Sequence, residues 1–355
     1  MAVQNRRRPS GLRILLTVLK ILYIILFAIS AFVLVLFLVF KVAVKPPEVE
    51  QSVQVTVPAV QTTPAPQNTP AVTEEPDVEA TPTPTPTPEV IKLDRKEDFH
   101  TFLLLGTDDG NGNADTIMVG SYDVKNNKIS VLSVPRDTLV NVSRTVKKIN
   151  GAYGSGGVEQ VMDELEPILG FRPDHYIKVS LNAFVEVVDA LGGVYFYVPE
   201  DMWHDDGAGF IIDLKEGEQH LDGNKAMQLV RYRGYANADL GRMATQQKFL
   251  QQLAKQVLSW TTVSKIDDFA AIFKRNFDTD LTISEFAWFG TYALGLDMSS
   301  DVTFSTLPGH GDASYKGINW YYELYPNETK ALINSTVNPY TTDIPDSLFG
   351  IMQAW

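Results

Sequence analysis

Three aspartates and an arginine carry the most chemical content in this 355-residue chain. Asp108, Asp109 and Asp115 follow an apolar run that ends in LLLG, and a second apolar run leads back to Arg136. Such a site at strand ends suits a divalent cation, because Mg²⁺ prefers one or two carboxylates together with waters and phosphate oxygens. The pattern favours a metal-and-phosphate site. The alternative is a solvated turn, since Asp, Gly and Asn are common turn formers.

Asp108 and Asp115 are the stronger metal candidates in this loop. Gly110 and Gly112 lie between them and let a short loop fold back, so that both carboxylates can face one cation. Asp109 we expect to be solvated. We therefore predict Asp108 and Asp115 as metal ligands, with Mg²⁺ as the ion and Mn²⁺ as the alternative.

Four arginines from separate segments stand out against an acidic background. Arg136 leaves a strand beside Asp137, which we expect to make a local salt bridge. Arg231 and Arg233 present both guanidiniums on one side if their segment is extended, and Arg242 opens the next helix near its positive end. Arginine forks bind phosphate bidentately. The arginines thus indicate a phosphate site, and surface ion pairs with nearby acids are the alternative.

Other candidate motifs are weaker. Lys148 and the run AYGSGG (152–157) precede a helix and can approach a phosphate, but the P-loop pattern GxxxxGK[ST] is absent. The five histidines show no metal-binding spacing, and we interpret 204–206 (HDD) as a polar loop. There is no GxSxG signature of a serine hydrolase.

Strand and helix patterns alternate through the region that must position these residues. This order predicts an α/β fold, in which helices flank a central mixed sheet in a sandwich. Asn182 and Asp222 are the expected caps of two helices. The predicted strands are 100–105, 116–124, 129–134, 176–181, 194–198 and 302–307, and the predicted helices are 157–169, 182–191, 222–231, 246–259, 283–296 and 322–335.

The first part of the chain has a different character. Residues 21–40 form an uncharged apolar run long enough to span about 30 Å of hydrocarbon, and a cleaved signal peptide is the alternative. Four arginines and no acid precede the run, which predicts that the N-terminus stays inside. We expect a cytoplasmic segment (1–13), one transmembrane helix (14–44) and an extracellular remainder.

Proline marks a linker between this helix and the globular part. Residues 46–88 hold eleven of the twenty prolines, which is typical of an extended, polyproline-like stalk. We expect a Pro/Thr-rich extracellular linker (45–94), a domain carrying the site (95–340) and a short tail (341–355). The linker's predicted role is to hold the domain away from the bilayer.

Charge and cysteine usage limit the possible functions. Residues 1–47 hold seven Lys or Arg and no acid, so the remainder carries a net charge of −20. An acidic ectodomain argues against nucleic acid as a partner, because phosphate backbones need a basic footprint. The chain contains no cysteine, which excludes disulfides and thiolate chemistry. This fits a protein on the surface of a Gram-positive-type bacterium.

Taken together, the motifs resemble those of the LytR–CpsA–Psr (LCP) proteins, the glycopolymer ligases of bacterial cell walls. The resemblance covers roughly residues 99–259 and extends more loosely to the final helix. A single N-terminal membrane span also fits this family. The matching segments are, in order, LLLGTDD, NADTIMV, SVPRD, KINGAYGSGG, DALGGVYFYVP, EGEQHLDGNKAMQLVRYR and DLGRMATQQ.

The resemblance implies transfer of a phosphate-linked glycopolymer from an undecaprenyl-pyrophosphate carrier to peptidoglycan, usually at a muramic acid 6-hydroxyl. The prenyl tail would occupy an apolar cavity between the sheet and the helices. Asp108 and Asp115 would hold Mg²⁺ against the pyrophosphate. The implied catalytic residues are Asp108, Arg136, Arg231 and Arg233, and the implied pyrophosphate ligands are Arg136, Lys148, Arg231, Arg233 and Arg242.

Two positions depart from the family pattern. Asn113 and Thr245 stand where family members usually carry arginines, which removes positive charge near the expected pyrophosphate. Two alternatives therefore stay open: a non-catalytic binder or scaffold for lipid-linked precursors, and a pyrophosphatase that acts on them. Transcriptional regulation is disfavoured, because only about thirteen residues precede the predicted membrane helix.

Overall fold

The computed structural model describes residues 45–57, 89–107, 112–207, 209–236, 239–257, 277–293 and 295–354. Two compact units are distinguished, and the smaller comprises 1–48 and 281–291. Its described part contains most of helix α8 (Ile283–Ala293), where the Ser284 hydroxyl accepts a hydrogen bond from the Lys45 amide at 3.2 Å. All features below belong to the larger unit.

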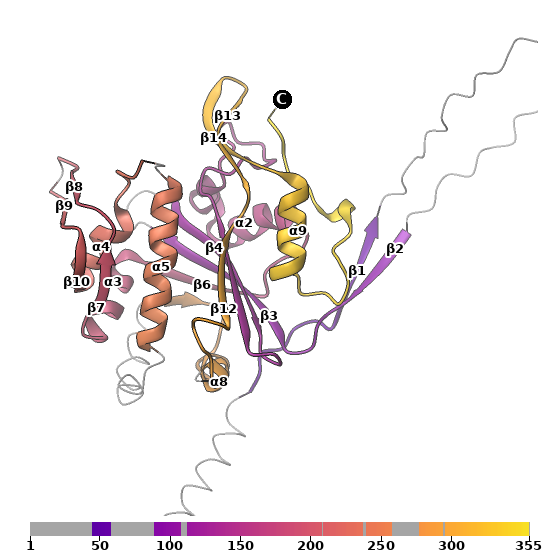
Figure 1. Cartoon of the computed structure of the whole chain (residues 1–355). Helices are drawn as coiled ribbons and strands as arrows, with labels where there is room; N and C mark the ends of the chain where they lie inside the picture. The colour runs from indigo at the N-terminus through magenta and orange to yellow at the C-terminus, as the bar shows by residue number, and fades with distance from the viewer. Residues whose placement is uncertain are drawn as a thin grey trace, which may run out of the picture. The chain divides into compact units, whose positions relative to one another are not determined.

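A six-stranded mixed sheet forms the centre of this unit, as predicted (Figure 1). Its order is β11-β6-β3-β4-β5-β12, with β3/β6 and β5/β12 parallel and the other pairs antiparallel. These strands are β3 (Phe99–Thr107), β4 (Ala114–Asp123), β5 (Lys128–Val134), β6 (His175–Ser180), β11 (Phe277–Thr279) and β12 (Val302–Thr306).

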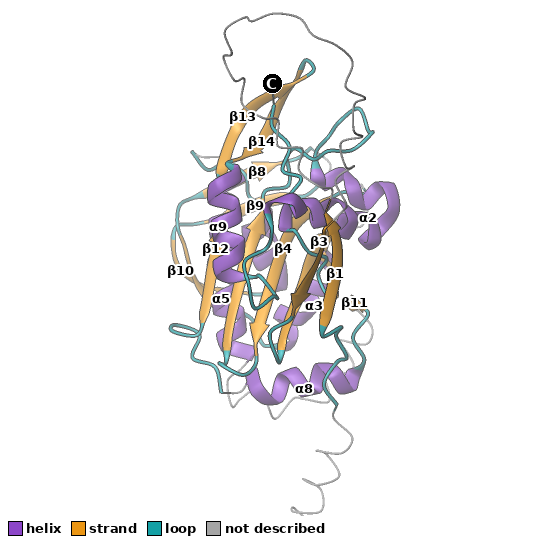
Figure 2. Ribbon diagram, turned by 90° about the vertical axis from the view of Figure 1, so that its right-hand side faces the viewer, coloured by secondary structure: helices purple, strands orange, loops and turns teal. Residues whose placement is uncertain are grey.

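One face of the sheet is filled by helices α2 (Ala152–Leu169) and α9 (Pro326–Thr336), which lie in front of the strands in Figure 2. Leu103 and Leu165 there are completely buried. Gly156 and Gly157 are non-helical and kink α2 near its start. The short 3₁₀ helices η1 (Ile149–Gly151) and η2 (Asp346–Leu348) flank this layer.

The other face is covered by α3, α4 and α5, so that the sheet lies between two helical layers (Figures 1 and 2). Two small two-stranded antiparallel sheets, β7/β10 and β8/β9, complete this side and share a second apolar core with the helices. The bounds are α3 (Leu181–Ala190), α4 (Gly223–Arg231), α5 (Asp239–Val257), β7 (Val194–Val198), β8 (Met202–Asp205), β9 (Ile211–Leu214) and β10 (Gly217–Leu221).

Most predicted strands and helices are confirmed, with two corrections at helix starts. The side chain of Ser180, and not that of Asn182, caps α3 by accepting from the Ala183 amide at 3.1 Å. The last helix begins at Pro326, because proline suits the first helical position. The preceding residues belong to β14 (Ile318–Leu324), which pairs with β13 (Gly309–Tyr315) in a hairpin that we did not predict.

The predicted linker also contains regular structure. Strand β1 (Ser52–Val57) pairs antiparallel with β2 (Glu89–Asp94), although proline composition had suggested an extended stalk there. Leu93 of β2 is 2% exposed within the main core, which anchors this pair to the domain. Among the described helices, none has the length and apolarity needed to cross a bilayer. The predicted span at 21–40 lies outside the described residues.

Candidate functional site

Strand register brings the acidic and basic motifs together at one edge of the central sheet. β4 and β5 are antiparallel with Ile117 opposite Val134. Asp115 precedes Ile117 by two residues and Arg136 follows Val134 by two, so both lie at the same edge. An Arg136 Nη1–H donates to Asp115 Oδ1 at 2.5 Å, which is a charge-assisted hydrogen bond.

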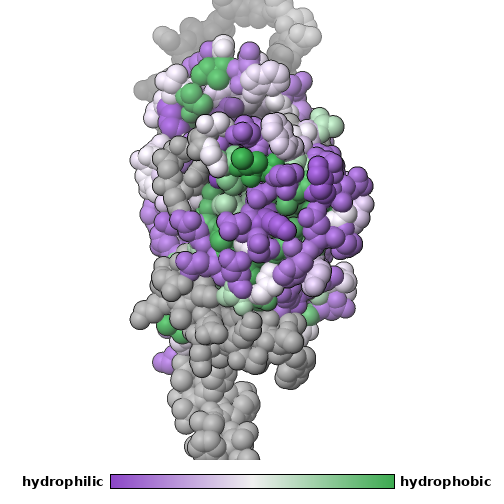
Figure 3. All heavy atoms as spheres, turned by 90° about the vertical axis from the view of Figure 1, so that its left-hand side faces the viewer, coloured by the Kyte–Doolittle hydropathy of each residue, from purple (hydrophilic) through white to green (hydrophobic). Residues whose placement is uncertain are grey.

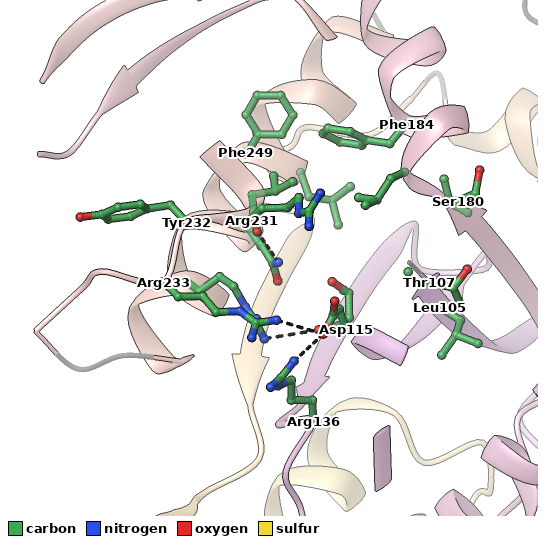
Figure 4. Close-up of a pocket in the computed structure, with 18 of the residues that line it drawn as sticks. Leu105, Thr107, Asp115, Arg136, Ser180, Phe184, Arg231, Tyr232, Arg233 and Phe249 are labelled. Carbon is green, nitrogen blue, oxygen red and sulfur yellow. Dashed lines mark hydrogen bonds and ion pairs between the residues drawn. The ribbon is translucent and has the colours of Figure 1, made fainter. Parts of the chain in front are cut away.

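Two further arginines contact Asp115 from the side of α4 and α5, and Figure 4 shows one of them, Arg233. Arg233, two residues beyond the end of α4, donates from Nη2 to Asp115 Oδ1 at 3.1 Å. Arg242 in the first turns of α5 is 2% exposed, and its Nη2 lies 3.4 Å from the Asp115 carbonyl oxygen. The predicted arginine cluster is thus assembled around one carboxylate.

Arg231 lies in the same cavity wall but points elsewhere. It is the last residue of α4, and its guanidinium carbon lies 4.2 Å from the centre of the Phe210 ring. Tyr232 between the two arginines has extended backbone, but the two guanidiniums do not share a partner as we predicted. Arg231 therefore makes a cation–π contact, while Arg233 faces Asp115.

A cavity of about 910 Å³ opens behind these arginines, between the sheet and the helical layer. Asp115 and the arginines lie at its rim, and most of the remaining lining is apolar, with polar residues such as His204 and Asp206 among it. On the side formed by α3–α5 and the two small sheets, apolar side chains are visible between polar ones (Figure 3). The apolar lining includes Leu104, Met118, Ile177, Val179, Phe184, Val187, Phe249, Leu250, Leu253 and Phe277.

Strand alternation explains why the cavity is apolar. Successive side chains of a strand point to opposite faces, so Leu103 enters the packed core with α2 and α9 while Leu104 faces the cavity on the side of α3–α5. Leu104 is only partly buried, because the space opposite it is not filled by side chains. An apolar cavity of this kind is typical of a ligand-binding site.

Two glutamines that we did not predict as site residues secure the arginine segments. Gln246 lines the cavity, and its Nε2 donates to the Val230 carbonyl at 2.9 Å, directly before Arg231. Gln247 Nε2 donates to Ser133 Oγ at 2.8 Å, near the end of β5. The run of glutamines in α5 was visible in the sequence, but its meaning depends on backbone carbonyls from distant segments.

The glycine-rich run has a structural role here. Gly154 lies so close to Gly112 that a Cβ on Gly154 would come within 2.5 Å of the Gly112 carbonyl oxygen. This contact places α2 against the loop that leads into Asp115. The predicted phosphate contact by this run is unsupported, since none of its residues lines the cavity.

Lys148 lies apart from the cavity lining. Its Nζ is 3.4 Å from Asp137 Oδ1 and 5.6 Å from the centre of the Tyr321 ring. Asp137 also lies 3.9 Å from Arg136 Nε, so the predicted local salt bridge is confirmed. Lys148 thus contacts the site through Asp137, and a direct pyrophosphate contact stays a prediction.

The two uncharged departures both fall in this region. Asn113 lines the cavity, and Thr245 is 6% exposed on α5 near the Tyr235 ring. Burial raises the pKa of Tyr235, and the neighbouring Thr245 side chain opposes that rise. Thr245, where the family pattern predicts an arginine, is thus a buried neutral residue next to Tyr235.

Asp115 is the described carboxylate that fits a metal at this rim. Its side chain is 35% exposed, and hard carboxylate oxygen is the donor type that Mg²⁺ prefers. Within the described residues, no group of three His, Cys, Asp or Glu is placed to hold an ion. One or two carboxylates with phosphate oxygens would fit Mg²⁺, and Asp108, like Asp109, lies outside the described residues.

Two relatives illustrate what this chain is similar to in sequence. The TagU protein of Bacillus cereus (strain AH820), named polyisoprenyl-teichoic acid–peptidoglycan teichoic acid transferase, is 34% identical over 230 residues, 62% of this chain and 73% of TagU. Regulatory protein MsrR of Staphylococcus aureus (strain COL) is 32% identical over 225 residues, 62% of this chain and 67% of MsrR.

Solved structures share the fold. The crystal structure of B. subtilis TagV matches with a TM-score of 0.59 and 25% identity, covering 68% of this chain and 96% of TagV. TagT bound to LI-WTA matches with a TM-score of 0.57 and 24% identity, covering 67% and 89%. The LytR_cpsA_psr family model matches residues 65–337. By this match over most of its length, the chain belongs to the LytR_cpsA_psr family.

Proposed function

We propose that this protein is a cell-wall polymer transferase, which moves a phosphate-linked glycopolymer from a polyprenyl-pyrophosphate carrier to peptidoglycan. The observation that carries the proposal is one cavity with two chemistries: arginines around Asp115 at the rim and a hydrocarbon-lined interior. A substrate with an anionic pyrophosphate joined to a long apolar chain matches both parts. TagU, at 34% identity, is named as a transferase of this class.

The arginines would bind the pyrophosphate. Arg136 and Arg233 now share Asp115, and their fork-shaped donors suit phosphate oxygens equally well. Arg242 is buried at the same place, where low solvent exposure strengthens its attraction for an anion. Arg231 would add charge from the cavity wall. These residues hold the donor and neutralise charge, which is the main protein contribution to phosphoryl transfer.

Asp115, with Asp108, would hold Mg²⁺, and Mn²⁺ is the alternative ion. Bound there, the ion would neutralise charge on the pyrophosphate oxygens. Asp115 has a second role in this proposal, because its hydrogen bonds to Arg136 and Arg233 orient both guanidiniums before the donor arrives. A carboxylate that organises arginines in this way keeps them from folding onto the surface acids.

In the proposed reaction, the oxygen of an acceptor hydroxyl attacks the phosphorus that carries the glycopolymer. A new oxygen–phosphorus bond forms as the bond to the polyprenyl phosphate breaks. The polyprenyl monophosphate takes the bonding electron pair, and the hydroxyl proton passes to a base. The arginines stabilise charge on the leaving group, and the product is a phosphodiester between polymer and peptidoglycan.

The protein would act outside the cell, anchored by the predicted helix within 14–44. The acidic ectodomain supports this placement, since it offers no footprint for nucleic acid. The Pro-rich segment would give the domain reach from the bilayer. Nothing in the proposed reaction requires a soluble substrate.

The direct test is a transfer assay with the full chain in detergent, Mg²⁺, a lipid-pyrophosphate-linked glycan and peptidoglycan. We expect a phosphodiester product with the parent protein and none with Asp115→Ala. Arg172→Ala is the matched control, because Arg172 forms exposed ion pairs with Glu159 and Asp163. Tight donor binding without product under any condition would contradict transfer.

That contrary result would favour the second candidate, a protein that holds lipid-linked precursors without transferring them. Its supporting observation is that Asn113 and Thr245, both in the site region, carry no charge. Asn113→Arg and Thr245→Arg then become informative, since a gain of transfer would identify charge as the missing factor. Release of free phosphate ends without acceptor would instead indicate pyrophosphatase action.

A further inference from the structure

The β13–β14 hairpin carries an exposed aromatic side chain in an unusual backbone conformation. Trp320 is 70% exposed and has φ +66°, a left-handed conformation that bulky residues rarely adopt. The pairing register shifts between Ala313 and Tyr315, which is the mark of a bulge. Bulges re-aim side chains and occur often beside active sites. The hairpin projects beyond the sheet in Figures 1 and 2.

The two residues after Trp320 are buried and fix its position. Tyr321 is fully buried, and its hydroxyl accepts from the Lys147 amide at 3.1 Å. Tyr322 is 7% exposed, and its hydroxyl donates to the Leu307 carbonyl at 3.0 Å. A tryptophan on so rigid a base loses little conformational freedom when it binds a partner.

This rigid base is joined to the arginine rim. The Tyr322 amide donates to the Asp137 carbonyl at 2.9 Å, and the Tyr322 carbonyl accepts from the Leu139 amide at 3.0 Å. Asp137 follows Arg136 in sequence, and its carboxylate contacts Lys148. Yet no residue of the hairpin lines the cavity. The hairpin therefore flanks the rim from outside the donor cavity.

The surroundings of Trp320 distinguish between possible partners. Only polar side chains accompany it on the exposed surface of the hairpin, and their charges are mixed. A membrane-docking surface would instead need contiguous apolar residues or an excess of positive charge. The accompanying exposed residues are Asp312, Ser314, Lys316 and Asn319.

We propose that the β13–β14 hairpin, through Trp320, docks the glycan strand of the acceptor. A sugar ring presents an apolar C–H face that can lie on the indole, whose face is electron-rich, and hydroxyls that can bond to amide groups. Ser314 Oγ donates to Asn319 Oδ1 at 2.7 Å, which fixes one such amide beside Trp320. This inference rests on the proposed transfer function.

The position of the hairpin indicates that it binds the acceptor glycan and not the donor glycan. In-line displacement requires the attacking and leaving oxygens on opposite sides of phosphorus. With the prenyl phosphate directed into the cavity, the acceptor must reach Arg136 from outside it. The hairpin occupies such an outside position, next to the Arg136–Asp137 segment.

The test is co-sedimentation of the full chain in detergent with peptidoglycan sacculi stripped of attached polymers. We expect Trp320→Ala to raise the half-saturating sacculus concentration about tenfold, and Trp320→Phe to keep most of the binding. Trp320→Gly removes the side chain but suits the positive φ, so it separates lost contact from misfolding. Tyr195→Ala is the control, because Tyr195 is 69% exposed on β7.

Unchanged sacculus binding in Trp320→Ala and Trp320→Gly would overturn the inference. An equal loss of sacculus binding in Tyr195→Ala would also overturn it. So would Trp320 variants that keep sacculus binding but lose binding to anionic vesicles or to lipid-free donor polymer. Binding of the lipid-pyrophosphate donor is measured in parallel and should be unchanged in the Trp320 variants. If the parent protein fails to bind that donor, the proposed function fails while the sacculus result still stands.

Discussion

The two faces of the central sheet are built from the same strands, but one is packed and the other borders a cavity. On one face, Leu103 is fully buried against α2 and α9. On the other, its neighbour Leu104 faces a cavity of about 910 Å³. A filled face contributes stability, since interiors are close-packed. A hollow face leaves apolar surface uncovered, which is favourable only if a ligand is to cover it.

The largest expected effect comes from breaking the rim of the hollow face. Arg136→Ala should lower the transfer rate about 1,000-fold, as removal of one charge-stabilising donor commonly does. Its stability should change little, because the side chain is partly exposed and Arg233 still pairs with Asp115. Single-turnover kinetics and thermal unfolding together test this. A loss of activity explained entirely by unfolding would contradict it.

A pair of neighbouring substitutions separates the two faces directly. Leu103→Ala should lower the free energy of unfolding by about 3 kcal/mol, because it opens a void in the packed core. Leu104→Ala should lower it by only about 1 kcal/mol, since its side chain already borders empty space. Polyprenyl-pyrophosphate affinity should change only in Leu104→Ala. Urea unfolding and donor binding measure both, and equal destabilisation would refute the contrast.

At the end of β3 opposite the arginines, His100 is buried and stacks on His175, with 6.2 Å between the ring centres. Burial lowers the pKa of His100 to about 4, although the charge of Asp174 opposes the shift, and His175 and Arg95 reinforce it. Below the unfolded value of about 6.5, the unfolded state binds a proton that the folded state excludes. Stability should therefore fall by roughly 2–3 kcal/mol from pH 7 to pH 4.

His100→Gln tests this assignment. The variant should lose stability at pH 7 but show a flatter decline between pH 6.5 and pH 4, measured by chemical unfolding across that range. His204→Gln, at an exposed position on β8, should follow the parent's curve. An unchanged slope in His100→Gln would show that other groups control the acid sensitivity.

The smallest expected effect concerns a hydrogen bond from α5 that positions the segment carrying Arg231 and Arg233. Gln246→Met removes the hydrogen bond to the Val230 carbonyl and should weaken donor binding by roughly 0.5–1.5 kcal/mol. Gln251→Met is the matched control, because Gln251 bonds the Met298 carbonyl, away from the arginines. Calorimetric titration with a soluble diphosphate lipid analogue measures the difference. Equal effects in both variants would assign Gln246 a purely structural role.

Local patterns in the sequence predicted much of this architecture. Apolar runs in 100–105 and 129–134 predicted the central strands, and Asp222 was correctly predicted as a cap. Of the arginines predicted to share a phosphate site, Arg136, Arg233 and Arg242 contact Asp115. Arg231 contacts the Phe210 ring instead. Arg136 reaches Asp115 from the end of the neighbouring strand β5, and Arg233 reaches it from the segment after α4.

What the sequence did not reveal depends on tertiary context. The β13–β14 hairpin turns at Lys316 and Gly317, both with positive φ, but a Lys-Gly pair is a weaker turn signal than Asn-Gly. Strand β1 follows prolines and gains its stability from pairing with β2. Gln246 has no distinctive spacing, and only its contact with Val230 indicates a role.

The central claim is that the hollow face receives the lipid chain while the arginine rim holds its pyrophosphate. A crystal structure of the full chain with a polyprenyl pyrophosphate tests it most directly. We expect the hydrocarbon beside Leu104, Ile177 and Phe249, with the diphosphate in contact with Arg136 and Arg233. A diphosphate bound away from these arginines, or a chain lying outside the cavity, would contradict the account.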